Sequence, residues 1–251
     1  MFASYPVQLA ALFAVGILAG FINTVAGGGS FLTLPLLIFM GLPASVANGT
    51  NRLAILLQSV AGMGKFHSSG VFPWRFALVV SVPAVAGALL GAHWAVGMGD
   101  EAFKRWLALF MVVMTFVSLY KPKGRLAPAT NGYSPRRWLA ILASFFVIGL
   151  YGGFIQAGVG FLLLAGMAFT DSDLVRGNAV KVFVVFLFTL FAMGIFIANH
   201  KVDYGLGVVL GLGSAIGAWV GARASVKGGS LFIRRFVMAM MVLFAVKLLW
   251  G

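Results

Sequence analysis

Apolar runs close to 20 residues long recur from one end of the chain to the other. A helix of that length crosses a hydrocarbon layer of about 30 Å, and a helix can pair its backbone polar groups internally, as lipid requires. Only 9% of the residues are charged and 61% are hydrophobic, whereas a soluble domain carries roughly 25% charged residues. The sequence therefore predicts an all-α integral membrane protein that crosses the bilayer several times.

The apolar segments form two series that share one order of lengths. The first series covers residues 7–25, 31–40, 46–64, 74–97 and 103–120, and the second covers residues 137–156, 160–169, 176–198, 204–222 and 232–250. The second segment of each series is shorter than the ~20 residues of a typical span. The residues alone leave open whether these two short segments cross the bilayer.

Short motifs also repeat between the two series. "GALLGAH" at 87–93 resembles "GAWVGAR" at 217–223, and "KRW" at 104–106 resembles "RRF" at 234–236, 130 residues later in both cases. Glycines spaced by four in these motifs are typical of close helix packing. The simplest explanation is an internal duplication. We therefore predict two membrane repeats, residues 1–120 and 137–251, joined by a basic linker at 121–136.

Loop charges predict the orientation of the two repeats, because cytoplasmic loops are enriched in Lys and Arg. The linker together with Arg137 just after it holds five basic residues and no acid, so we place it in the cytoplasm, and the positive loop at 65–75 lands on the same side. The loop at 100–105 is neutral. In the second series the equivalent loops exchange character, since the one at 201–203 is balanced and the one at 223–235 is strongly positive. The second repeat is therefore predicted to be inverted, with both termini outside the cell.

Charge and composition also exclude several functions. The net charge of +13 does not indicate nucleic-acid binding, because the basic residues sit mostly in short loops between spans. The chain has no cysteine, which excludes disulfides and thiolate sites, and we expect no metal and no cofactor. An intramembrane enzyme would need a nucleophile with a base, or titratable groups gathered at depth. All five acidic residues instead fall in or beside predicted loops.

A glycine-rich stretch precedes each short segment, "AGGGSF" at 26–31 and "AGVGF" at 157–161. Unpaired backbone in hydrocarbon is tolerated only beside protein or a water-filled cavity. The first N–H groups of the short helix that follows have no intrahelical partner, so they favour an anion. Inversion would aim the two helix N-termini at each other across a shared polar hollow near the midplane. The alternative is that these glycines serve only close packing or a tight turn.

Polar and basic residues flank both glycine stretches. Arg52 and Lys181 lie early in the third segment of each series, and a cation at membrane depth usually marks a pathway or a binding partner. The alternatives are that both cations snorkel to the headgroups and that the polar residues only satisfy backbone freed by the break. The candidate substrate-binding residues are Asn23, Thr24, Gly27, Gly28, Gly29, Ser30, Thr50, Asn51, Arg52, Gln156, Gly158, Gly160, Asn178 and Lys181.

Several of these stretches resemble a known family. "GFINTVAGGGSFLTLPLL", "ANGTNRLAILLQS", "AGVGFLLL" and "NAVKVF" are similar to the TauE/SafE family, the sulfite exporters also called TSUP permeases. The resemblance covers nearly the whole chain and places the family's glycine motif on residues 27–29 and its Gly-Thr-Asn motif on residues 49–51. In the second repeat Val159 interrupts the glycines, and Asn178 stands where a Thr is expected.

The resemblance implies a transporter in the plasma (inner) membrane for small sulfur-containing anions such as sulfite or organosulfonates. An anion that leaves a cell with a negative interior moves downhill, so export needs no coupling ion, and our hypothesis is uncoupled or substrate-proton-linked efflux. The residues leave open an anion channel, an importer of a sulfonate, thiosulfate or carboxylate, and a scaffold that transports nothing. They also leave open whether the chain forms a homo-oligomer in the lipid bilayer.

Overall fold

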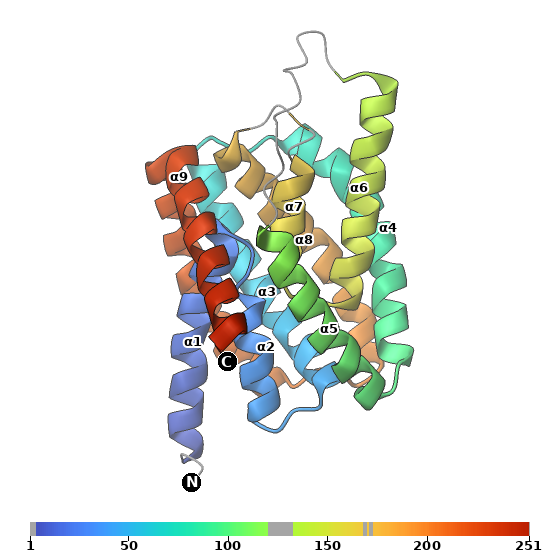
Figure 1. Cartoon of the computed structure of the whole chain (residues 1–251), viewed down its shortest axis with the longest axis vertical. Helices are drawn as coiled ribbons and strands as arrows, with labels where there is room; N and C mark the ends of the chain where they lie inside the picture. Colours follow the sequence, from blue (N-terminus) through green and yellow to red (C-terminus); the bar gives the residue numbers. More distant parts are fainter. Residues whose placement is uncertain (1–3, 120–132, 168–169, 171–172, 251) are drawn as a thin grey trace.

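The computed structural model describes residues 4–119, 133–167, 170 and 173–250. Within these ranges the chain forms helices joined by short turns, with no strand (Figure 1). The first half contains α1 (Tyr5–Val25), α2 (Ser30–Phe39), α3 (Ala44–Ser68), α4 (Trp74–Gly97) and α5 (Asp100–Leu119). The second half contains α6 (Pro135–Phe154), α7 (Val159–Gly166), α8 (Leu174–Ala198) and α9 (Tyr204–Trp250).

These helices confirm the predicted all-α membrane class. Five of them are long and apolar enough to cross a membrane by length and composition: α1, α4, α6, α8 and the Tyr204–Ile233 part of α9. Gly229, with a φ of 61°, interrupts α9 and separates the two apolar segments expected there. Large apolar side chains such as Leu78, Val82 and Leu139 lie exposed on the long helices, as lipid contact requires.

The two short helices do not cross the bilayer. α2 has 10 residues and α7 has 8, so at 1.5 Å per residue they are about 15 and 12 Å long. Figure 1 shows that α1 enters from the end where the N-terminus lies and that α2 returns toward that end. α6 enters from the opposite end, and α7 returns there. This arrangement is consistent with two inverted repeats, each with a helical hairpin that turns inside the molecule.

Contacts between helices repeat with the same spacing. A Cβ added at Gly217 of α9 would lie 1.9 Å from the carbonyl oxygen of Ile17 in α1. A Cβ added at Gly87 of α4 would lie 2.1 Å from the carbonyl oxygen of Phe146 in α6. Both glycines therefore let two backbones touch, as predicted from their spacing. We call residues about 130 positions apart, such as these, counterparts.

Two counterpart side chains, those of Asp100 and Ser230, cap the N-termini of α3 and α8. The Asp100 Oδ1 atom accepts a hydrogen bond of 3.0 Å from the Ser45 N–H, and the Ser230 Oγ atom accepts one of 3.3 Å from the Leu174 N–H. Partial burial opposes the charge of Asp100. Backbone N–H groups at the start of α3 and nearby Lys201 outweigh this effect, so the pKa of Asp100 lies below its usual value.

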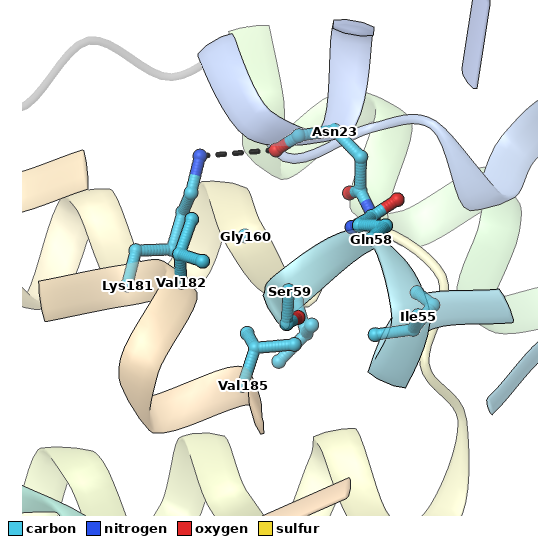
Figure 2. A pocket seen from close by; sticks show the side chains of 9 residues that line it. Asn23, Ile55, Gln58, Ser59, Gly160, Lys181, Val182 and Val185 are labelled. Carbon is cyan, nitrogen blue, oxygen red and sulfur yellow. Dashed lines mark hydrogen bonds between the residues drawn. The ribbon is translucent and has the colours of Figure 1, made fainter. Parts of the chain in front are cut away.

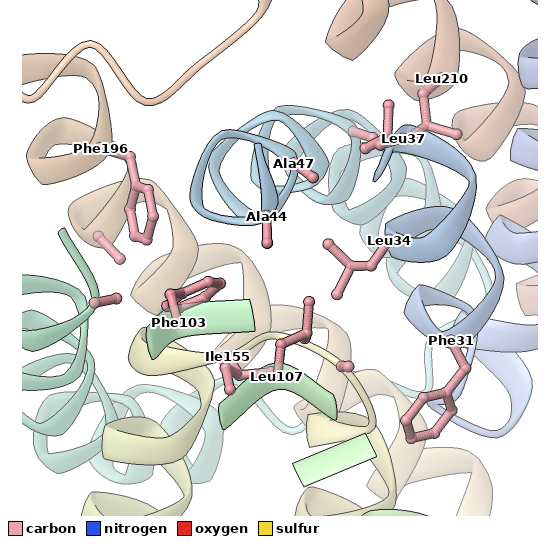
Figure 3. Packing of buried hydrophobic residues seen from close by; sticks show 14 of the residues in the cluster. Phe31, Leu34, Leu37, Ala44, Ala47, Phe103, Leu107, Ile155, Phe196 and Leu210 are labelled. Atoms are coloured by element: carbon pink, nitrogen blue, oxygen red, sulfur yellow. The ribbon is translucent and has the colours of Figure 1, made fainter. Parts of the chain in front are cut away.

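The short helix α2 lies in the protein core and not in lipid. Its residues Phe31, Leu34 and Leu37 are buried in a cluster with Phe103 and Leu107 of α5, which Figure 3 shows from close by. Phe39 in the last turn is the one residue of α2 that is exposed, at 81%. Protein therefore surrounds the glycine break at the other end of α2, as a break at membrane depth requires.

Candidate functional site

Each helical hairpin turns at a residue whose backbone conformation only glycine adopts at low cost. Gly27 has a φ of 101° and Gly158, its counterpart, a φ of 75°, and L side chains rarely adopt such values. A Cβ at Gly27 would also lie 2.4 Å from the backbone of Gly160. Residue 28 has no positive φ, so its counterpart Val159 can carry a branched side chain without interrupting the turn.

The N-termini of α2 and α7 meet inside the molecule, as predicted. The backbones of Gly27 and Gly160 are in contact, and the rings of Phe31 and Phe161 stack with centroids 6.4 Å apart. The expectation of an open hollow shared between the two tips is wrong, because the tips pack directly against each other. The polar groups of the site lie around this contact and not inside it.

Lys181 of α8 binds the end of α1. Its Nζ atom donates to the carbonyl oxygens of Asn23 at 3.0 Å and Thr24 at 2.7 Å, and the Asn178 Nδ2 atom donates to the Val25 oxygen at 3.1 Å. The last carbonyls of a helix have no intrahelical partner and carry the negative end of the dipole. A buried ammonium and an amide therefore satisfy the backbone that the break leaves open.

Arg52 of α3 binds the end of α6 in the same way. An Nη atom of Arg52 donates to the Gly153 carbonyl oxygen, and the Asn48 Nδ2 atom donates to the Phe154 oxygen at 3.0 Å. The guanidinium also lies 4.4 Å from the centre of the Phe196 ring, within the range of a cation–π contact. Each repeat thus supplies the cation and the amide that cap the broken helix of the other repeat.

These contacts decide two questions that the sequence left open. Arg52 is 0% exposed and Lys181 is 2% exposed, so neither side chain reaches out to the headgroups. Asn178 is the counterpart of Asn48, since both donate to the last carbonyl of a broken helix. The structure therefore pairs Asn178 with Asn48 and not with Thr50, and the capping residues of the two repeats match.

Other candidate residues hydrogen-bond within the protein. Asn51 accepts from the Thr33 hydroxyl at 2.7 Å and donates to the Ser30 hydroxyl at 3.1 Å, which ties α3 to α2. The Thr50 hydroxyl accepts from the Asp203 N–H at 2.9 Å. The Gln156 amide donates to the Thr189 hydroxyl at 2.7 Å. These side chains hold the helices around the breaks in place.

A small cavity lies beside the N-terminus of α7, between α3 and α8 (Figure 2). Its volume is about 10 Å³, room for about one water molecule. It is lined by Asn23, Ile55, Gln58, Ser59, Val159, Gly160, Lys181, Val182 and Val185. Three of the candidate residues, Asn23, Gly160 and Lys181, therefore meet there.

The sequence analysis missed Gln58 and Ser59. Ser59 follows Arg52 by seven residues and so lies on the same face of α3 two turns later. The signal in the sequence was the helical spacing of polar residues along "NGTNRLAILLQS". This spacing continues for two turns beyond Arg52 and ends at Ser59.

Comparison with known proteins identifies the family. The model of the sulfite exporter TauE/SafE family matches residues 12–248. The chain belongs to the TauE/SafE family. Two similar relatives are described as probable membrane transporter proteins: ORF9 of Sinorhizobium sp., 27% identical over 96% of this chain and 92% of its own, and a protein of Haemophilus influenzae, 26% identical over 96% and 94%.

A further relative, the probable membrane transporter protein YfcA of Escherichia coli K12, is 26% identical over all of this chain and 93% of its own. No solved structure matches the chain significantly. The family and these relatives are membrane transporters, so this TauE/SafE protein is a multi-pass membrane transporter and not an enzyme.

Several buried polar atoms around the two breaks of this TauE/SafE protein lack a hydrogen-bond partner, although most buried polar groups in proteins have one. Near Lys181 they are Thr24 Oγ1, Ser59 Oγ and Asn178 Oδ1, and near Arg52 they are Asn48 Oδ1, Gln156 Oε1 and the Arg52 Nε and Nη1 atoms. Of these residues Ser59 lines the cavity, so the cavity wall has at least one hydroxyl whose hydrogen-bonding capacity the described residues do not use.

Proposed function

We propose that the protein is a carrier that exports small sulfur-containing anions, such as sulfite or organosulfonates, and that it binds them beside the two helix breaks. The observation that supports this most is the position of Lys181. Its ammonium is buried in the wall of the cavity, next to the N-terminus of α7. Both groups attract negative charge.

Lys181 retains capacity for an anion. An ammonium has three donors, and two contacts go to carbonyl oxygens of α1. Among the described residues, no Asp or Glu lines the cavity, so none of their carboxylates competes there with the substrate for the ammonium. Removing a buried positive charge from water is unfavourable unless it is paired, and an anion would supply that partner.

The proposed direction follows from the membrane potential. An anion that leaves a cell with a negative interior gains about 2.3 kcal/mol per charge per 100 mV. Proton-coupled carriers commonly use carboxylates at membrane depth. The described acidic residues, Asp100, Glu101, Asp173 and Asp203, lie at or beside helix ends, and Asp171 lies outside the described residues. We therefore propose uncoupled or substrate-proton-linked efflux, with the basic linker in the cytoplasm and both termini outside.

The test is flux into and out of proteoliposomes that contain the purified protein. We expect saturable sulfite efflux that rises with an outward-driving potential and persists without a sodium gradient. Lys181→Met should lower the flux at least tenfold, since it removes the proposed countercharge, and Lys65→Met, at the cytoplasmic end of α3, should leave it unchanged. Thermal unfolding in detergent checks that both variants are folded.

Other outcomes would change the proposal. Strict dependence on a sodium gradient would contradict uncoupled efflux. Currents far above carrier rates without counterflow of labelled substrate would indicate an anion channel. Flux of a carboxylate but not of sulfite or a sulfonate would contradict the proposed substrate class. Unchanged flux in folded Lys181→Met would remove Lys181 from the site.

A further inference from the structure

We infer that each chain holds one anion site and not two, and that Gln58 and Ser59 of α3 contact the substrate there, opposite Lys181. The counterpart position in the second repeat is filled by Phe188 and Thr189. This inference rests on the proposed function, because it specifies how the anion of that proposal is bound.

Ser59 has the properties of a binding residue. It is 1% exposed, its Oγ atom has no hydrogen-bond partner among the described residues, and it lines the cavity. Gln58 precedes it, is 7% exposed and lines the same cavity. Figure 2 shows both side chains on α3, with Lys181 on the other side of the cavity and Asn23 above Gln58. An unpaired hydroxyl buried in a cavity wall costs stability, and an anion would supply its partner.

The second repeat lacks this arrangement. The counterparts of Gln58 and Ser59, 130 residues later, are Phe188 and Thr189. The Thr189 hydroxyl is already bound, since it accepts from the Gln156 amide at 2.7 Å. Phe188 is 0% exposed, and a Cβ at Gly152 would lie 2.9 Å from the tip of its ring. An aromatic ring therefore occupies the place where the first repeat has a polar cavity wall.

The lining of the cavity specifies the class of substrate. An ammonium, a primary amide and a hydroxyl can each donate a hydrogen bond, which suits the oxygens of a small oxyanion. The apolar lining side chains, Ile55, Val159, Val182 and Val185, suit at most a short alkyl group. The cavity holds about one water molecule, and sulfite or methanesulfonate is larger, so α3 and α8 must separate slightly on binding.

The experiment measures binding of sulfite and methanesulfonate to the purified full-length protein by titration calorimetry. We expect one anion per chain. Ser59→Ala should weaken binding about tenfold, because a hydrogen bond to a charged group is lost. Gln58→Glu should abolish detectable binding, since it places a negative charge of similar size beside the anion. Thr189→Ala, the matched control at the counterpart position, should bind within about twofold of the wild type.

The outcomes separate this inference from the proposed function. Two anions per chain, or folded Ser59→Ala and Gln58→Glu variants that bind like the wild type, would overturn the inference while anion transport by the wild type still stands. If the wild type transports the anions and the Thr189→Ala variant no longer binds them, the site lies in the second repeat. A wild type that neither binds nor transports either anion would overturn both.

Discussion

Single glycines determine where each helical hairpin can turn. Gly27 and Gly158 both have a positive φ, and Gly27 also touches the backbone of the opposite hairpin, at Gly160. The two positions thus separate two physical effects. One is the conformational strain of a side chain at positive φ, and the other is the steric exclusion of a Cβ by a backbone that cannot easily move.

We predict that Gly27→Ala destabilises the protein more than Gly158→Ala does. Both variants introduce the strain of a left-handed Ala, about 1 kcal/mol, and Gly27→Ala adds a clash of about 1–3 kcal/mol. Thermal unfolding in one detergent compares the two. Gly158→Asn, which tolerates positive φ better, should fall between Gly158→Ala and the wild type. Equal unfolding temperatures for the two Ala variants would show that the contact of the two hairpins is not tight.

At the scale of helices, close packing defines two rigid pairs, α1 with α9 and α4 with α6. Glycines at their crossings bring the backbones together, as at Gly217 against Ile17 and at Gly87 against Phe146. α3 and α8, which carry the two cations, contact each other and lie beside these pairs. The cavity lies between α3 and α8, so neither of the two pairs has to come apart on binding.

We predict that Gly217→Ala lowers stability and Gly64→Ala does not. A Cβ at Gly217 would lie 1.9 Å from a backbone oxygen of α1, whereas a Cβ at Gly64 of α3 would meet nothing within 4 Å. Overpacking costs about 1–3 kcal/mol, and Ala gains about 1 kcal/mol over Gly in an open helix position. Thermal unfolding should therefore shift down for Gly217→Ala and stay level or rise for Gly64→Ala. A Gly217→Ala variant as stable as the wild type would contradict the close crossing.

The helices themselves were readable from the sequence, because each is an apolar run ended by Gly, Pro or polar residues. The breaks were readable too, since glycine-rich stretches are costly inside a span. The partners of Arg52 and Lys181 were not, because a sequence does not show that each cation reaches the carbonyls of the other repeat. The cavity was missed for a similar reason: Ser59 is one polar residue in an apolar stretch, and its role depends on the helix that faces it.

At the scale of the whole molecule, the two repeats enter from opposite ends (Figure 1). The loop between α3 and α4 and the loop between α4 and α5 lie at opposite ends of α4. Under the proposed orientation the first faces the cytoplasm and the second faces outward. The boundaries of the repeats, residues 1–120 and 137–251, and most of the linker's basic residues are still predictions, since residues 120–132 lie outside the described part.

We predict that a cysteine at Ser68 is labelled only from the cytoplasm and one at Glu101 only from outside. Both residues are exposed, and the chain has no cysteine of its own, so single-cysteine variants carry no background. A maleimide that cannot cross membranes should label Glu101→Cys in intact cells, and Ser68→Cys only after permeabilisation. The reverse pattern would show that the orientation inferred from the loop charges is wrong, and labelling of both from one side would contradict the arrangement of α4.

The exchange of caps between repeats affects how the protein is made. While the ribosome is still synthesising residues beyond the linker, α1 and α3 have already entered the membrane. At that moment the final carbonyls of α1 and the guanidinium of Arg52 both await partners on a part of the chain that does not yet exist. Lys181 and Gly153 supply those partners later. The first half is therefore incomplete when it is made: Arg52 gains its partner only once α6 has followed, and the end of α1 gains its partner only once α8 has been translated.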